Sequence, residues 1–298
     1  MYTRVSSTQM ADSSLYGIQQ SYARFSNAET VLNTGKQLQK ASDNPTGAAQ
    51  VLDYQERSAE LTQYNSNIET AQNFLSTTES ALKNVQSLTN QARTIGVQAA
   101  NGTANADSLS ALSGQLRDIT NQIARIGNTT YGSQYIFAGQ RTDTAPIVAG
   151  PSGFTYTGGT IATGDASLTL TIGRSESVQI NTTGDKVFVP LLNTLTKLNN
   201  DISSGSLSVV SSDLALVDVQ LNNVQSVQAD IGSKSNLLTL TQQRNTINQD
   251  NYTKFISNIQ DADAPHAVVE LQSAQNAYQA ALSATSHVYQ NSLLNFLK

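Results

Sequence analysis

The sequence predicts a mainly α protein with a small inserted β domain, built as a long helical bundle or coiled-coil rod from both chain ends. Apolar residues recur at alternating steps of three and four in both halves of the chain, which is typical of amphipathic helices with a seam. Ten of the 18 glycines fall within 127–185, among short β-branched runs. The five prolines, at 45, 146, 151, 190 and 265, are interpreted as boundaries between periodic segments, because proline ends helices.

The first helix is expected to run to about residue 36. Its seam comprises Leu15, Ile18, Tyr22, Phe25 and Leu32, with Glu29 as the one polar exception. A turn and a restart follow within 41–47, where Asn44 can cap the next helix and Pro45 suits its first position.

Two further helices are predicted before the insert. The second is long and carries two heptad series: Ile68, Leu75 and Leu82, and beside them Ala71, Thr78, Val85 and Ala92. After a loop at Asn101-Gly102, Asp107 can cap a third helix. The seam of this helix is unbroken: Leu109, Leu112, Leu116, Ile119, Ile123 and Ile126.

The β insert is expected to contain strands at 154–157, 168–172, 177–181 and 187–189, separated by Gly, Asp and Ser turns. Helices then resume at Leu191. The next seam is Leu214, Val217, Leu221, Val224, Ile231 and Leu238; it weakens through Asn245 and Asn248 and recovers at Tyr252, Phe255 and Ile259.

After the break at 261–265, a last helix is expected to carry Leu271, Ala274, Tyr278, Ala281, Thr285 and Val288 and to end in Leu293-Leu294-Asn295-Phe296-Leu297. We interpret the middle seams, 109–126 and 214–231, as intramolecular core. The two terminal helices are predicted to pack between subunits, because a single amphipathic helix is marginal in water. They should be poorly ordered in a free monomer and should fold on assembly.

Composition excludes several classes of partner. The net charge is −5 and Lys and Arg do not cluster, so nucleic acid and membrane surfaces are not expected partners. The charged fraction is 13%, roughly half of the usual one quarter, which favours a surface that packs against copies of itself. There is no cysteine, no apolar run that could span a membrane and no secretory signal at the N-terminus.

No catalytic, cofactor or metal site is predicted, and we do not expect an enzyme. The two histidines, His266 and His287, are too far apart in sequence to share a small site. Asp261 and Asp263 stand at a helix break, where capping explains them better than acid–base or cation chemistry. The charged residues of the insert form no pattern: Asp165, Arg174, Glu176, Asp185 and Lys186.

Three stretches resemble the flagellin superfamily. Thr34–Leu38 followed by Asp43, Asn44 and Pro45 is similar to the motif after the first flagellin helix, although Asn44 replaces the common second Asp. Tyr135, Ile136, Phe137, Ala138 and Gly139, with Thr142 and Pro146, resemble the signature of the hook–filament junction branch, the FlgL type. The end of the chain, from Ile259 to Leu297, resembles the flagellin C-terminal domain.

The resemblance implies a structural adapter that forms a thin ring at the hook–filament junction. It implies terminal coiled-coil helices lining the channel (1–44 and 262–298), a flagellin-like rod (45–139 and 190–261) and an inserted β-rich domain (140–189). Implied partners are copies of itself, the larger hook-associated junction protein, flagellin, and a cytosolic export chaperone at the C-terminal helix. The implied location is extracellular, in the flagellum, after passage from the cytoplasm through the flagellar type III system.

The expected assembly interface is formed by the terminal seams. Its residues are Leu15, Ile18, Tyr22, Phe25, Leu32, Leu271, Ala274, Tyr278, Ala281, Leu282, Val288, Leu293, Leu294, Phe296 and Leu297. Two alternatives share much of the pattern: a short filament flagellin, and a coiled-coil secretion-tip or adapter protein outside the flagellum. Pro45 and the Tyr135–Gly139 motif favour the junction branch.

Overall fold

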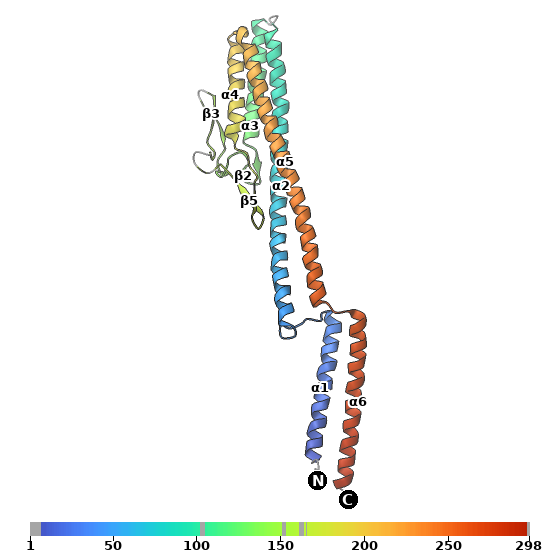
Figure 1. Cartoon of the computed structure of the whole chain (residues 1–298). Coiled ribbons are helices and arrows are strands. Elements are labelled where there is room, and N and C mark those ends of the chain that lie inside the picture. Colours follow the sequence, from blue (N-terminus) through green and yellow to red (C-terminus); the bar gives the residue numbers. More distant parts are fainter. Residues whose placement is uncertain (1–6, 102–104, 151–152, 161–163, 165, 297–298) are drawn as a thin grey trace. The chain divides into compact units, whose positions relative to one another are not determined.

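The computed structural model describes residues 7–101, 105–150, 153–160, 164 and 166–296; of Ser7, Thr8, Ala11 and residues 288–296 it describes only the backbone. The predicted fold class is confirmed: long helices precede and follow a short β-rich segment in the sequence (Figure 1). The chain divides into two compact units, one made of residues 1–60 and 248–298 and the other of residues 61–247. Among the helices that the structure describes, none has the length and hydropathy needed to cross a membrane.

The first unit, residues 1–60 and 248–298, contains α1 (Ser7–Thr34) and α6 (Ala264–Phe296), which lie side by side (Figure 1). It also contains the start of α2 (Pro45–Ala100) and the end of α5 (Leu207–Gln260). There, Tyr54 of α2 stacks on Tyr252 of α5 with ring centroids 5.8 Å apart and also contacts Phe255 at 5.4 Å.

The restart after the first helix forms as predicted. Helix α2 begins at Pro45, and the Asn44 side-chain Oδ1 accepts a hydrogen bond from the Gly47 N–H at 2.9 Å. There is little room for a side chain at Gly47. An added Cβ would lie 2.7 Å from Asn44 Nδ2 and 3.2 Å from a methyl group of Ile259. The cap and the absence of a side chain at 47 therefore set the start of α2 together.

The second unit, residues 61–247, has a continuous hydrophobic core. Helices α2 and α5 run antiparallel, since Gln72 bonds to Gln242 while Arg93 pairs with Asp218 at 2.7 Å. Helices α3 (Ala106–Gly127) and α4 (Gly184–Ser203) pack on each other beside them (Figure 1). The predicted seams of the second and third helices are buried or partly buried throughout.

Among the described residues between α3 and α4, the strands form three two-stranded antiparallel hairpins that do not join into one sheet. They are β1 (Thr130–Tyr131) with β2 (Gln134–Tyr135), β3 (Ile147–Gly150) with β4 (Gly153–Tyr156), and β5 (Thr169–Gly173) with β6 (Glu176–Gln179). The last two contain the predicted strands at 154–157, 168–172 and 177–181 within one or two residues at each end. The β3–β4 hairpin packs on α3 and α4, whereas the β5–β6 hairpin accepts hydrogen bonds from Asn67 of α2 and Asn245 of α5 (Figure 1).

Two predictions around the insert are wrong. Residues 187–189 are not a strand, because α4 already begins at Gly184 and buries Val187 and Phe188 on its inner face. Pro190 consequently lies inside α4 rather than at a boundary. Proline removes the helical bond that residue 190 would donate to the Lys186 carbonyl, and that carbonyl instead accepts a hydrogen bond from Asn223 Nδ2 of α5 at 2.8 Å. Pro151 lies outside the described residues.

Two smaller predictions also need correction. The N-cap of α3 is Asn105, whose Oδ1 accepts from the Ser108 N–H at 2.8 Å, while Asp107 lies in the first turn. The seam of α5 does not weaken at Asn245, which is buried and donates from Nδ2 to the Ile172 carbonyl at 3.4 Å. A polar residue therefore occupies a core position because the β5–β6 hairpin supplies its partner.

Candidate assembly surface

The contact between α1 and α6 is built from large and small residues that alternate at heptad spacing. On α6 the small residues Ala267 and Ala274 are buried, and the larger Leu271 and Tyr278 between them are partly buried. On α1 the partners include Ile18, Phe25 and Ala28, of which only Ala28 is fully buried. Such alternation lets two helices interlock, as knobs do in holes.

Aromatic rings form the centre of this contact. The Phe25 ring stacks on the Tyr278 ring with a centroid distance of 6.1 Å and an interplanar angle of 10°. Tyr22 also reaches Tyr278, at 5.6 Å, although 55% of its surface is exposed. Offset aromatic contacts of this kind stabilise a helix pair by about 0.5–1.5 kcal/mol beyond the area that they bury.

The predicted interface residues therefore divide into two groups. Ile18, Phe25, Leu271, Ala274, Tyr278 and Ala281 are buried or partly buried between α1 and α6. Leu15, Tyr22, Leu32 and Leu282 stay exposed, by 36–55% of their surface. Of Val288, Leu293, Leu294 and Phe296 the structure describes only the helical backbone, and Leu297 lies outside the described residues.

Further apolar residues of α1 and α6 are exposed, although they were not among the predicted interface residues. Tyr16 on α1 is 68% exposed, and Val268 and Val269 on α6 are 48% and 68% exposed. Pairing α1 with α6 thus covers one apolar face of each helix and leaves further apolar side chains in contact with water. Apolar side chains that gather on an exposed surface mark interaction sites.

Backbone hydrogen bonds join the segment that follows α1 to the segment that precedes α6. Gln37 and Leu38 donate their N–H groups to the Gln260 carbonyl at 2.7 and 3.3 Å, and Ala262 donates to the Gly35 carbonyl at 2.9 Å. Gly35 adopts a positive φ of 68°, which explains a glycine at the end of α1. The Thr34–Leu38 stretch thereby holds together two parts of the chain that are distant in sequence.

The Tyr135–Gly139 motif lies in the second unit and is a packing element. Ile136, Phe137 and Ala138 are almost fully buried, and Phe137 meets Phe188 of α4 edge to face at 4.6 Å. The Phe137 carbonyl accepts hydrogen bonds from the Gly184 N–H and the Tyr156 hydroxyl, each at 2.9 Å. The motif therefore fastens the hairpins to the start of α4.

The other motif residues also have local structural roles. Asp43 Oδ2 accepts from the Lys40 N–H at 3.0 Å, next to the Asn44 cap. Gly139 has a positive φ of 66°, and the Tyr135 N–H donates to the Thr142 carbonyl at 2.9 Å. These contacts form a turn, and none of them places a reactive group in a cavity.

Sequence reasoning missed Ala28, Val31 and Ala267, which complete the α1–α6 contact. Their signal was the heptad spacing of small residues, as in Ser14, Ser21 and Ala28. Both histidines are exposed on α6, and Glu176 of the insert pairs with Arg244 at 2.5 Å. In the part of the chain that the structure describes, no three His, Asp or Glu side chains come together as a metal site.

Comparison with known proteins finds flagellin regions in both halves of the chain. Residues 5–142 match the bacterial flagellin N-terminal helical region, and residues 214–297 match the C-terminal helical region. Flagellar hook-associated protein 3 of Escherichia coli strain K12 is 27% identical over 323 aligned positions, which cover 99% of this chain and all of that protein.

Solved structures share the fold. A flagellar hook-associated protein from Vibrio parahaemolyticus superimposes with a TM-score of 0.67 at 21% identity, over 74% of this chain and all of the other. The flagellar junction protein FlgL from Legionella pneumophila superimposes with a TM-score of 0.60 at 16% identity, over 71% of this chain and all of the other. With both flagellin regions present in order, and a hook-associated relative aligned from end to end, the chain belongs to the flagellin superfamily, in its FlgL-type (hook-associated protein 3) group.

Proposed function

We propose that this protein is a structural adapter subunit of the bacterial flagellum and forms a thin ring between the hook and the filament. The observation that carries the proposal is the end-to-end alignment with a flagellar hook-associated protein 3. The exposed apolar residues of α1 and α6 support it, because an adapter must bury surface against neighbouring subunits. No enzymatic step belongs to this function.

The proposal assigns a role to each part of the chain. The terminal helices, 1–44 and 262–298, form the inner layer that lines the channel, and the helices of 45–139 and 190–261 form the rod around it. The hairpins of 140–189 project from the rod. Copies in such a ring meet through two different surfaces, the heterologous mode that builds rings and tubes.

The proposed partners follow from the same assembly. Each copy contacts its neighbours in the ring, the larger hook-associated junction protein on the hook side and flagellin on the filament side. Before export through the flagellar type III system, a cytosolic chaperone covers the C-terminal helix. Val268, Val269 and Leu282 of α6 are exposed apolar residues that such a chaperone would shield.

Deletion of the gene in its source organism tests the function. Electron microscopy should show hooks without filaments, and unassembled flagellin should accumulate in the medium. Expression of the wild-type chain from a plasmid should restore filaments. Intact filaments in the deletion strain would instead indicate an accessory flagellin or a coiled-coil protein outside the flagellum. Lost filaments without released flagellin would indicate the filament subunit itself.

A further inference from the structure

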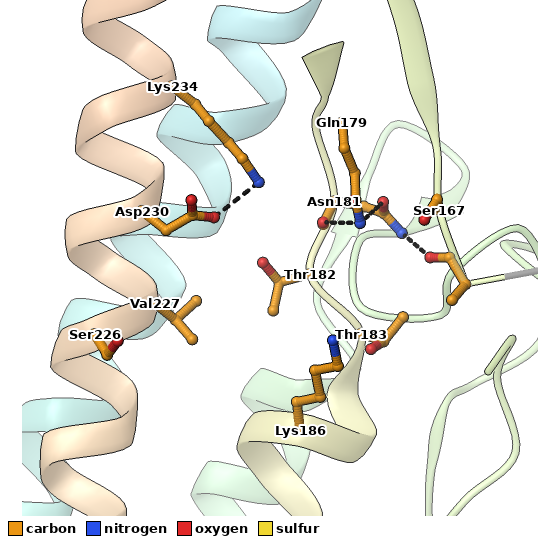
Figure 2. A pocket seen from close by; sticks show the side chains of 11 residues that line it. Ser167, Gln179, Asn181, Thr182, Thr183, Lys186, Ser226, Val227, Asp230 and Lys234 are labelled. Carbon is orange, nitrogen blue, oxygen red and sulfur yellow. Dashed lines mark hydrogen bonds and ion pairs between the residues drawn. The ribbon is translucent and has the colours of Figure 1, made fainter. Parts of the chain in front are cut away.

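A polar hollow of about 340 Å³ lies in the second unit, where α5 passes the turn between β6 and α4 (Figure 2). The turn contributes Thr182 and Thr183, α4 contributes Lys186, and α5 contributes Ser226, Asp230 and Lys234. Figure 2 shows the Lys186 side chain extending from α4 toward the turn and the Lys234 side chain extending from α5 into the same space. Nothing in the assembly function uses these groups.

Hydrogen-bond donors predominate in the hollow. Lys186 and Lys234 bring ammonium groups, and Thr182, Thr183 and Ser226 bring hydroxyls that can rotate to donate. Asp230 brings the carboxylate among these lining residues, and it accepts from the Lys234 Nζ at 2.8 Å. Since this pair is neutral, the Lys186 ammonium adds one positive charge without a counterpart in the lining.

Thr183 is the residue that points to a ligand. It occupies the N-cap position of α4, with φ −82° and ψ 145°, yet its side chain makes no capping hydrogen bond. Only 4% of its surface is exposed, and that surface lines the hollow. Since this side chain makes no capping bond and borders the hollow, its hydroxyl can donate to a bound molecule that accepts a hydrogen bond.

The start of α4 favours a negatively charged ligand. The first N–H groups of a helix lack partners within the helix, and the aligned peptide dipoles make this end positive. The Gly184 N–H is already taken by the Phe137 carbonyl, and the Lys186 N–H makes only a long contact of 3.4 Å with the Thr183 carbonyl. Asp185 lies in the same turn but does not line the hollow, so it lowers the positive potential without filling the site.

We propose that this hollow binds a small oxyanion, with phosphate and carboxylate groups as its ligand chemistry. Lys186 supplies the principal charge, Thr183 and Thr182 donate hydrogen bonds, and the Lys234–Asp230 pair and Ser226 form the α5 wall. A bound oxyanion would link the β6–α4 turn to α5. It would thereby fix the insert on the helices of this unit.

Titration of the full chain with inorganic phosphate at constant ionic strength tests the site. Amide resonances of residues 182–186 should shift and saturate, which gives a dissociation constant for this place in the structure. Site-resolved resonances are preferable to melting temperatures, because phosphate stabilises folded proteins in general by exclusion from their surface. Acetate, titrated in the same way, separates a site for any carboxylate from one that needs phosphate.

Two variants and one control make the test specific. Lys186→Gln removes an exposed ammonium, and we expect the dissociation constant for phosphate to rise at least about tenfold, as for loss of a charge-assisted bond. Thr183→Val should also weaken binding. Lys254→Gln makes the same charge change on an exposed lysine of the other unit and should leave the constant unchanged. Absence of saturable shifts at 182–186, or equal weakening by Lys186→Gln and Lys254→Gln, would overturn the proposal.

Discussion

The two units bury their apolar residues to very different degrees. The largest fully buried side chains among the described residues all belong to residues 61–247, from Ile68 on α2 to Leu195 on α4. Among the described residues of 1–60 and 248–298, the buried apolar side chains are few, and three of the five are alanines: Ala28, Leu38, Val51, Ala267 and Ala274. Because hydrophobic stabilisation scales with buried apolar area, we expect the middle of the chain to be stable by itself and the terminal pair to be marginal.

One chain thus combines a unit whose apolar residues are covered within the chain with a unit that leaves many of its apolar residues exposed. In the middle unit, α3, α4 and the hairpins cover the seams of α2 and α5. The α1–α6 pair has one contact face, and side chains such as Tyr16 and Val269 are exposed beside it. We expect neighbouring copies to cover these side chains in the assembly.

The largest effect is expected from a charge on the terminal pair. Leu282→Asp places a carboxylate on the exposed side of α6, where 43% of the leucine is in contact with water in the single chain. The free protein should fold as before, while incorporation into the flagellum should be abolished, because burial of an unpaired charge is strongly unfavourable. Electron microscopy of a deletion strain that expresses the variant measures filament formation.

The conservative variant Leu282→Met is the matched control, since it keeps the volume and the apolar character. Filaments of normal number should form on it. If filaments also form normally on Leu282→Asp, then α6 is not packed between subunits at this position and the terminal interface is wrongly assigned.

Amide hydrogen exchange of the free monomer should differ between the terminal helices and the middle unit. We expect the N–H groups of α1 and α6 to exchange through local opening, at rates that approach those of an unfolded chain. The N–H groups of α2 near Leu75 and Leu82, which lie in the buried seam, should open only with global unfolding. Equal, strong protection of residues 7–34 would mean that the helix pair folds without neighbours.

Truncation in the core should destabilise the monomer far more than truncation in the terminal pair. Phe188 is fully buried against Phe137, so Phe188→Ala should lower the free energy of unfolding by about 3–5 kcal/mol. Leu15→Ala, at a position that is 53% exposed, should change it by less than about 0.5 kcal/mol. Denaturant unfolding followed by circular dichroism gives both values, and similar losses would refute the contrast.

Helical seams were predictable from the sequence because their period reports directly which face is buried. All of Ile68, Leu75 and Leu82 proved buried. The strand predicted at 187–189 failed because Val and Phe also suit a helix whose start is fixed by tertiary contacts, here the bond from the Gly184 N–H to Phe137. Periodicity could not show that Asn245 has a partner, which comes from a hairpin more than 60 residues away in the sequence.

The candidate interface was predictable only in part, because periodicity identifies an apolar face but not the partner that covers it. Heptad spacing identified both terminal seams, but it could not decide which residues α1 and α6 bury between themselves. Leu15 and Tyr22 were assigned to the same seam as Ile18 and Phe25, yet they face water in the single chain. A helix that contacts more than one neighbour needs a wide apolar face, and a sequence pattern does not assign each part of that face to a partner.

A smaller effect is expected at the start of α2. Asn44→Ala removes the side-chain acceptor for the Gly47 N–H and should cost about 1 kcal/mol, as loss of an N-cap does. Since this cap lies in residues 1–60, the loss should appear as faster amide exchange at the start of α2. Asn44→Asp keeps an acceptor and should restore protection. An unchanged exchange rate in Asn44→Ala would mean that Pro45 and Gly47 fix the helix start without the cap.

The smallest effect should be a change in the pH dependence of stability at the α4–α5 turn. Asp213 of α5 has a side chain that is 1% exposed, and it forms an ion pair with Lys197, which also bonds to Asp201 at 2.9 Å. Burial raises the pKa of Asp213, whereas the hydrogen bond from Lys197 lowers the pKa of Asp201. The two carboxylates therefore link folding to pH with opposite signs.

For Asp213 the native chain binds a proton more readily than the unfolded chain. Its contribution to stability is present below the unfolded pKa of about 3.8 and is lost as pH rises through the raised native value. For Asp201 the contribution is present above the unfolded value and is lost as pH falls through the lowered native one. Asp213→Asn removes the first contribution and weakens the second, because the hydrogen bond with Asp213 also lowers the pKa of Asp201. Above about pH 3.8, however, the Asp201 contribution is already complete, so the first one alone varies with pH there.

The stability of the wild type relative to Asp213→Asn should consequently decline as pH rises from about 4 toward neutrality. Urea unfolding at a series of pH values, with Asp201→Asn as the control of opposite sign, measures this difference. A difference that is constant over the whole range would mean that Asp213 titrates as it does in the unfolded chain. A difference that grows with pH would mean that Lys197 outweighs burial and makes Asp213 a stabilising carboxylate at neutral pH.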